Sequence, residues 1–190
     1  MDETSLAACV EAMTRLHPGV HLNVVHGSEQ HPTLDVLRRE LADILILPTT
    51  TLDEHHVEHV HWSDAYVLVA ARSRLLTPRP FHELCEGVRY VSWRHAGVER
   101  LHGQLAAAQV RLSHRGELSC VATLLDLVEK GQCMTILPSR LVPDDGRLFE
   151  CVRLPVQVER SISVIARPGS LLSNAANEVI EVLKRLRVGD

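Results

Sequence analysis

The most conspicuous chemical groups in the sequence are the histidines and carboxylates of DEHHVEHVH at residues 53–61. His55 and His59 would share a face of a helix, and His59 and His61 would share a face of a strand, as metal ligands must. The alternative is a run of solvated histidines at the surface, and we favour it. We therefore expect no metal site and no cofactor. The run consists of Asp53, Glu54, His55, His56, Glu58, His59 and His61.

The cysteines do not indicate redox chemistry. They are scattered, odd in number and without a CxxC pair, a pattern typical of a reducing compartment in which thiols serve as small apolar core residues. Cys120 lies at the N-terminus of an expected helix, where a thiol pKa can be lowered. Cys133, however, lies beyond the far end of that helix, so no resolving partner is evident. The five are Cys9, Cys85, Cys120, Cys133 and Cys151.

Catalytic and surface-binding classes find little support. The chain contains no GxSxG, P-loop or HExxH motif and no GxGxxG after a strand, so we predict that it is not an enzyme. A formal charge of −4 gives no basic footprint for nucleic acid. No apolar run approaches the ~20 residues of a membrane span, and MDETSLAACVEAM does not resemble a signal peptide. We predict a cytoplasmic protein without membrane contact.

Hydroxyl groups at the expected ends of strands and starts of helices indicate a binding site instead. In open α/β sheets, ligands lie beyond the carboxyl ends of strands, where helix N-termini favour an anion. Each serine has a plain alternative as a helix N-cap, and Trp93 either stacks on a ligand or closes the core. Arg94 either binds a carboxylate or is solvated. The candidate ligand-binding residues are Thr4, Ser5, Gly27, Ser28, Ser92, Trp93, Arg94, His95, Leu118 and Ser119.

Helices and strands alternate along the chain that positions these residues. The first fifty residues predict a helix over Leu6–Leu16, a strand over Val20–Val25, a helix over Thr33–Leu41 and a strand from Ala42. This α-β-α-β order predicts a parallel sheet with helices on its faces. The expected later elements are two strands separated by Ser63–Asp64, the strand VRYVSW, a helix in AGVERLHGQLAAAQV, a helix from Ser119 to Gly131, a strand over Cys133–Leu137, a strand from Arg160 and a helix from near Ser173.

The pattern also predicts two lobes. Strand–helix alternation restarts after a proline-rich break at residues 76–80, and the final strand and helix have no evident partners in the second block. We expect lobe I over residues 1–70 and 163–190 and lobe II over 71–162. A cleft between two lobes is a typical place for a small ligand.

Four segments in order resemble the effector-binding, or substrate-binding, domain of LysR-type transcriptional regulators. They are LHPGVHLNVVHGS, LRRELADILILP, WSDAYVLVAARSRLL and ELSCVATLLDLVEKGQCMTILPSRL, and the resemblance extends from about Thr4 to Arg187. It implies an α/β, two-lobed fold like that of type 2 periplasmic binding proteins, each lobe a mostly parallel sheet flanked by helices. It also implies a small organic effector, with a carboxylate as one candidate, in the cleft between the lobes.

Two departures from the family pattern bear on these expectations. The family opens this domain with a strand before the first helix, and here only Met1–Glu3 precede it. Either the sequence begins after that strand, or this member lacks it. Peroxide-sensing members carry a cysteine pair in the second lobe, whereas the corresponding segment SWRHAG contains no cysteine. The histidine run falls in a loop that varies within the family.

The resemblance implies a ligand-sensing domain of a transcriptional regulator. Such domains pair side by side through a first-lobe helix and strand, so we expect a homodimer or tetramer that uses Leu6–Leu16 and its neighbours. DNA would be contacted only through an N-terminal helix-turn-helix domain, which this chain does not contain. The alternative is a free-standing solute-binding protein for a transporter, against which the lack of a secretion signal counts.

Overall fold

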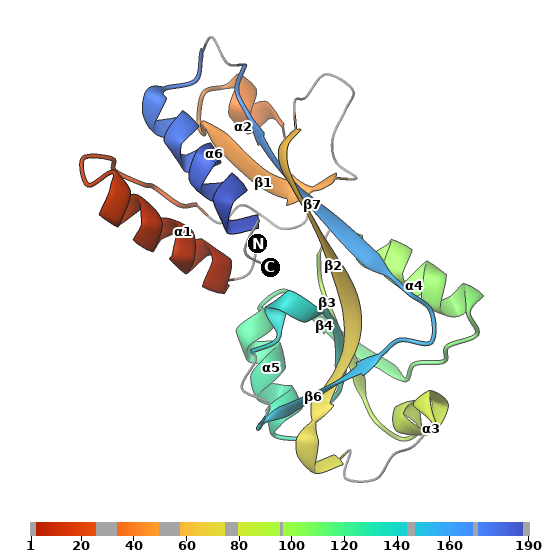
Figure 1. Cartoon of the computed structure of the whole chain (residues 1–190). Helices are drawn as coiled ribbons and strands as arrows, with labels where there is room; N and C mark the ends of the chain where they lie inside the picture. Colours follow the sequence, from red (N-terminus) through yellow and green to blue (C-terminus); the bar gives the residue numbers. More distant parts are fainter. Residues whose placement is uncertain are drawn as a thin grey trace. The chain divides into compact units, whose positions relative to one another are not determined.

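A computed structural model of the chain describes residues 3–25, 34–49, 58–74, 80–95, 97–143, 147–168 and 171–187. The chain divides into two compact units (Figure 1). The first consists of Met1–Ser63 and Ser161–Asp190, and the second of Asp64–Arg160. The two divisions fall within long strands, β2 (Glu58–Ala71) and β7 (Glu159–Ala166), so each of these strands contributes residues to both units.

The first unit packs two helices and a sheet around an aliphatic core. Helix α1 (Glu3–Leu16) contacts α6 (Asn174–Arg187), and β1 (Ile44–Pro48) pairs antiparallel with β7. Cys9 and Met13, one helical turn apart on α1, are buried against the strands because a spacing of four residues repeats one helix face. The last helix begins near Ser173, as predicted, and Ser173 caps it, since its Oγ accepts a hydrogen bond from the Ala176 N–H at 3.1 Å. The short helix α2 covers Asp35–Arg38.

The second unit is built on β2, which carries a different core on each face. Tyr66, Leu68 and Ala70 belong to one buried cluster and Val69 to another, because successive side chains of a strand point to opposite faces. Helix α4 (Val98–Ala107) contributes to the first cluster and α5 (Val121–Glu129) to the second. The other elements are α3 (Phe81–Cys85), β3 (Tyr90–Trp93), β4 (His114–Leu118), β5 (Thr135–Pro138), β6 (Phe149–Arg153) and the single 3₁₀ turns Arg72–Arg74 and Ser139–Leu141.

Helix α5 ends at the predicted glycine. Gly131 has φ of +67°, a backbone conformation that glycine adopts at little cost. Its N–H donates to the Val128 carbonyl at 2.8 Å, and the Gln132 N–H donates to the Leu127 carbonyl at 2.9 Å. These two bonds form a Schellman motif, which satisfies the last carbonyls of the helix and turns the chain toward β5. The predicted connection between helix and strand is therefore confirmed.

The α/β class is confirmed, but the expectation of a mostly parallel sheet in each lobe is wrong for the described strands. The pairs β1–β7, β2–β5 and β2–β6 are antiparallel, whereas β3–β4 is parallel. Residues 20–25 form no strand, so β1 is the one strand among the described residues of the expected α-β-α-β segment. The neighbour of β1 is then β7, which arrives from the far end of the sequence and runs in the opposite direction.

Four further local predictions differ from the structure. The helix expected over residues 33–41 is limited to Asp35–Arg38, and the two strands expected around Ser63–Asp64 are one continuous strand, β2. Strand β6 (Phe149–Arg153) was not among the expected strands. The N-cap residue of α5 is Cys120 rather than Ser119.

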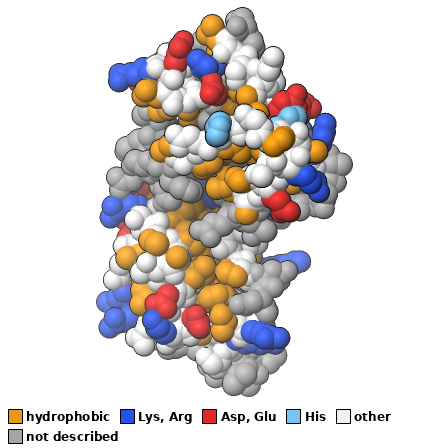
Figure 2. Space-filling view, turned by 90° about the vertical axis from the view of Figure 1, so that its left-hand side faces the viewer, with side chains coloured by type: hydrophobic (Ala, Val, Ile, Leu, Met, Phe, Trp, Pro, Cys, Tyr) orange, Lys and Arg blue, Asp and Glu red, His pale blue; other side chains and the backbone are white. Residues whose placement is uncertain are grey.

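The surface shows mixed chemistry. On the face drawn in Figure 2, the described basic, acidic and hydrophobic side chains are interspersed, without a continuous basic stripe. Within the described residues, no helix combines the length and apolarity required to cross a bilayer.

Candidate functional site

Two of the predicted ligand-binding segments, Ser92–His95 and Leu118–Ser119, meet at one corner of the second unit. Because β3 and β4 are parallel, their carboxyl ends coincide, with Trp93 opposite Leu118. The Arg94 N–H donates to the Leu118 carbonyl at 2.8 Å, and the indole N–H of Trp93 donates to the Ser119 carbonyl at 3.1 Å. The N-terminus of α5 follows directly. We call residues 92–95 and 118–120 the β3–β4 corner.

The accessible groups of the corner suit an anion. Arg94 is exposed, and its Nε donates to Glu117 Oε2 at 2.9 Å. Ser119 and Cys120 are exposed at the start of α5, where the first backbone N–H groups of a helix have no intrahelical acceptor. The parallel pairing of β3 and β4 therefore brings a guanidinium, a hydroxyl and a helix N-terminus to one corner, and all three favour negative charge.

The other predicted residues of this corner are buried and engaged with the protein. Ser92 Oγ lies 3.0 Å from His114 Nε2, and Ser92 is fully buried. Trp93 and His95 expose only 7% and 8% of their surface. Their rings stack with centroids 4.2 Å apart and planes inclined by 12°. Trp93 thus closes the core of the second unit, which was one of its two interpretations.

The hydrogen bonds of His95 fix its tautomer. Its Nδ1 lies 2.9 Å from the Trp93 carbonyl, which can only accept, so Nδ1 carries the proton. Its Nε2 therefore accepts from the Tyr66 hydroxyl at 2.6 Å. Burial lowers the pKa of His95 to about 4, and the positive charge of Arg160 acts in the same direction. Burial likewise raises the pKa of Tyr66 to about 12. Both groups are neutral at physiological pH.

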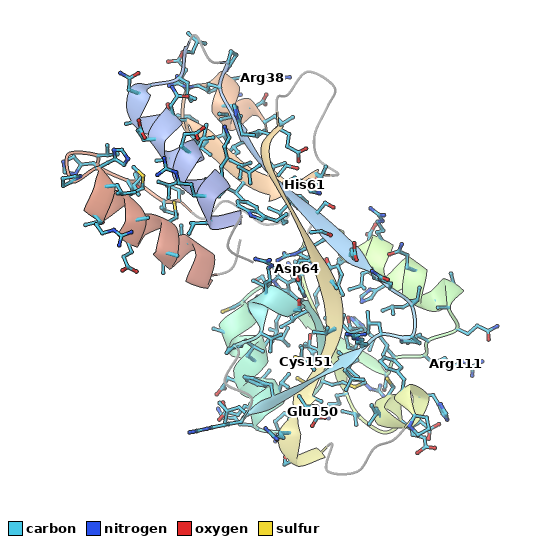
Figure 3. All side chains as sticks on the ribbon, in the orientation of Figure 1. Arg38, His61, Asp64, Arg111, Glu150 and Cys151 are labelled. Carbon is cyan, nitrogen blue, oxygen red and sulfur yellow. The ribbon has the colours of Figure 1, made fainter. Side chains whose placement is uncertain are left out.

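A buried ion pair completes this region and was missed in the sequence. Asp64 is the first residue of the second unit and Arg160 the last; the Arg160 Nη2 lies 3.4 Å from Asp64 Oδ2. Asp64 Oδ1 accepts from the Ser139 hydroxyl at 2.8 Å and from the Arg140 N–H at 3.3 Å. The guanidinium carbon of Arg160 lies 5.6 Å from the centroid of the Trp93 ring, within cation–π range. Figure 3 labels Asp64 on β2.

The signal for this pair was Asp64 itself, a carboxylate directly before the largely apolar run AYVLVAA. We interpreted Ser63–Asp64 as a break between strands, whereas the carboxylate is buried inside one. Nothing in the residues around Arg160, at the start of the final strand, indicated a pairing with Asp64. We call Asp64, Tyr66, Trp93, His95 and Arg160 the Trp93 cluster.

The structure does not describe the side chains of the ligand-binding residues that were predicted in the first unit. Thr4 and Ser5 lie in the first turn of α1 rather than before it, and their side chains are outside the described part. Gly27 and Ser28 fall outside the described residues. The first unit's share of the predicted binding site therefore stays a prediction.

The end of the histidine run forms a local hydrogen-bond network. His61 Nδ1 lies 2.9 Å from Glu58 Oε1, which also accepts from the buried Ser163 hydroxyl. Thr49 Oγ1 lies 2.6 Å from Ser163 Oγ. Residues 53–57 of the run are outside the described part. Among the described residues, no three histidine, cysteine, aspartate or glutamate side chains are grouped as metal ligands would be.

The described cysteines fall into two groups. Cys9, Cys85 and Cys133 are buried, and burial raises the pKa of each thiol, to about 11 for Cys85. Cys120 and Cys151 are exposed, and Figure 3 shows Cys151 on β6. The three buried thiols behave as the apolar core residues that the sequence predicted.

Comparison with known proteins places the chain among regulatory domains. Residues 1–187 match the family model described as LysR substrate binding domain. No curated protein matches the chain. The reduced regulatory domain of OxyR2 from Vibrio vulnificus matches with a TM-score of 0.74 and 19% identity over 96% of this chain and 89% of that one.

Two similar structures contain small molecules. The CcmR regulatory domain of Synechocystis PCC6803, in complex with 2-PG, has a TM-score of 0.76 and 12% identity over 97% of this chain and 91% of that one. The effector-binding domain of QuiR, in complex with shikimate, has a TM-score of 0.72 and 13% identity over 98% and 91%. At such identities the likeness shows the fold alone, which is that of type 2 periplasmic binding proteins.

Proposed function

Because the chain belongs to the family of LysR substrate-binding domains, we propose that it senses a small organic effector for a transcriptional regulator. Its DNA-binding part would lie outside this sequence. Binding would act through the effector's different affinity for two arrangements of the protein. The family consists of domains of transcriptional regulators, which are not enzymes. Family membership supports a regulator over a transporter's solute-binding protein.

The observation that carries the proposal for the site is the β3–β4 corner. Arg94 and Ser119 are exposed there beside the N-terminus of α5, in the place where open α/β sheets bind ligands. We expect the effector to present a carboxylate or another anionic group to this corner. The position of the effector in the cleft between the lobes, which the family resemblance implies, stays a prediction.

The test is a thermal-shift screen of the purified chain against small carboxylates and aromatic acids. A ligand at a hundred times its dissociation constant stabilises the fold by about 2.7 kcal/mol, which raises the Tm by several degrees. We expect Arg94→Ala to abolish the shift produced by an anionic hit. The unliganded variant should lose at most about 0.5–1 kcal/mol, because the Arg94–Glu117 pair is largely exposed.

Arg89→Ala is the matched control, since Arg89 is also exposed but directly precedes β3, at its opposite end. This variant should keep the full thermal shift. An anionic hit whose shift survives Arg94→Ala would place the effector elsewhere. A screen in which divalent metals alone raise the Tm would instead favour the histidine run.

We further propose that the domain pairs with a second copy of itself through α1 and residues 20–25. The family resemblance implies this surface, and apolar side chains are exposed on it: Val10 at 38%, Leu16 at 47% and Val24 at 48%. Exposed apolar residues that are close together are buried when copies associate.

Val10→Asp is expected to shift the chain from dimer to monomer in sedimentation-velocity experiments, because the new carboxylate would be desolvated at the contact. Its helical circular dichroism should be unchanged, since Val10 is exposed. Ala107→Asp, at an exposed position of α4, is the control and should leave the sedimentation coefficient as it is. A wild-type chain that remains monomeric at high concentration would contradict the proposal.

A further inference from the structure

The second unit brings three histidines into contact with hydroxyl groups around β3. Tyr66 OH lies 2.6 Å from His95 Nε2, and Tyr90 OH lies 3.0 Å from His102 Nε2. Ser92 Oγ lies 3.0 Å from His114 Nε2. The first pair connects β2 with the segment directly after β3. The second connects β3 with α4, and the third connects β3 with β4. We call the six residues the imidazole latch.

We propose that the imidazole latch makes the second unit a proton sensor, in which neutral His95 and His102 hold β2, β3 and α4 together and their protonation loosens these elements and the adjoining β4. This goes beyond effector sensing, because the proton response requires no effector. Its proposed influence on the effector rests on the function proposed above, through the Leu118 end of β4 in the β3–β4 corner.

The packing of the latch leaves little room for charge. Tyr90 is 1% exposed and lies between two of the imidazoles, with ring centroids 5.7 Å from those of both His102 and His114. The rings of His102 and His114 are 5.8 Å apart. A proton on His102 would therefore place a positive charge beside the buried Tyr90 phenol, in a site that already disfavours charge.

His95 has the least tolerance for a proton. Its Nδ1–H already donates to the Trp93 carbonyl, so the added proton would convert Nε2 from an acceptor of the Tyr66 hydroxyl into a donor. The hydroxyl would have to reorient, and the charge would be buried next to the positive Arg160. A proton at this position therefore weakens the contact between β2 and the end of β3.

The charged groups that face the latch do not compensate for added protons. Arg100 and Arg160 are cationic, and the nearby carboxylates are Asp64 and Glu117. Asp64 is bound to Arg160, and Glu117 is bound to Arg94. Both carboxylates therefore already have cationic partners. The titratable or charged residues facing the latch are Asp64 on β2, Arg100 on α4, Glu117 on β4 and Arg160 on β7.

The direction of the response follows from the pKa shifts. Burial lowers the pKa of His95 to about 4 from its usual 6.5, and burial followed by the charge of His114 lowers that of His102. The unfolded or opened state therefore takes up protons before the folded state does. The stabilisation is complete above pH 6.5 and is lost as the pH falls toward 4. At pH 5.0, His95 alone raises the opening equilibrium constant about 30-fold over its value at pH 7.5.

Hydrogen–deuterium exchange of the full chain at pH 7.5, 6.0 and 5.0, corrected for intrinsic rates, tests the latch. We expect peptides of α4 and β4 to lose protection about 30-fold at pH 5.0 relative to pH 7.5, and peptides of α1 and α6 to lose much less, although burial also lowers the pKa of His59 beside α6. Unchanged protection in α4 and β4 would overturn the proposal, and so would an equal loss in all four elements.

Variants separate the latch from general acid sensitivity. His95→Gln and His102→Gln should each reduce the pH-dependent loss at least threefold, because an amide does not titrate. His82→Gln, on the exposed side of α3 in the same unit, should behave as the wild type does. Equal behaviour of all three variants would overturn the proposal.

A measurement on the wild type covers the case in which a variant does not fold. The ring Cε1–H signals of the histidines report each imidazole's titration by NMR. His95 should titrate last as the pH is lowered, with a midpoint near 4, and a midpoint at or above 6.5 would overturn the proposal. None of these experiments uses an effector, so a failed effector screen and a failed latch are distinguishable.

Discussion

Asp64→Ala is expected to lower the free energy of unfolding by about 3–5 kcal/mol. The Asp64 side chain is only 4% exposed, and its carboxylate holds Arg160, the Ser139 hydroxyl and the Arg140 N–H. Alanine would remove all three contacts and leave the 14%-exposed Arg160 side chain without this counter-charge. A buried charge that loses its partner costs far more than the net stabilisation by the pair.

Urea denaturation followed by circular dichroism measures this loss as a lower midpoint with an unchanged m-value. Asp126→Ala is the matched control, because Asp126 forms a 2.6 Å ion pair with Lys130 at the surface. That substitution should cost about 0.5 kcal/mol or less. Asp64→Asn keeps one acceptor oxygen and should fall between the two. A loss for Asp64→Ala no larger than that for Asp126→Ala would contradict the structural role assigned to Asp64.

Trp93→Ala is expected to destabilise the chain by about 3–5 kcal/mol. The indole fills the core between β3 and α5, stacks on His95 and donates to the Ser119 carbonyl. Truncation leaves a cavity and exposes one face of the His95 ring. The same urea titration, with circular dichroism as the probe because the substitution removes a fluorophore, gives the value.

Trp93→Phe is the informative comparison for this site. Phenylalanine retains an aromatic ring against His95 but cannot donate to Ser119, so we expect a loss of about 1–3 kcal/mol. A loss below about 1 kcal/mol for Trp93→Ala would instead indicate that the ring contributes little to the core and is available to stack on a ligand.

The elements that were predicted correctly are those whose signals are local. The end of α5 at Gly131, the start of α6 near Ser173 and the apolar strand β1 each depend on a few adjacent residues, and the structure confirms all three. The strand expected over Val20–Val25 has the right alternation, but a strand also needs a hydrogen-bonding neighbour, which no local pattern can reveal. Val25 is 77% exposed. Strand β6 was not predicted because its own residues give a weak local signal. It forms a strand because it pairs with β2, which is distant in the sequence.

The site shows the same limit. The sequence identified Ser92–His95 and Leu118–Ser119 separately, and the parallel pairing of β3 and β4 brings them together. It did not identify Tyr66, whose hydroxyl reaches His95 across 29 positions of the chain, or the pairing of Asp64 with Arg160. Residue type alone suggested ligand contacts for Trp93 and His95, because burial by distant segments cannot be seen in a local pattern.

The discontinuous first unit has a consequence for biosynthesis. The second unit is a single uninterrupted stretch, Asp64–Arg160, whereas the first needs β7 and α6 to complete its core. During synthesis on the ribosome, the α1 segment emerges early, but its partners β7 and α6 are encoded more than a hundred codons later. The second unit can fold before those partners have been synthesised, because its contacts lie within one uninterrupted stretch. Its folding would then bring the two ends of the interrupted unit close to each other, which shortens the effective loop that the nascent chain has to close.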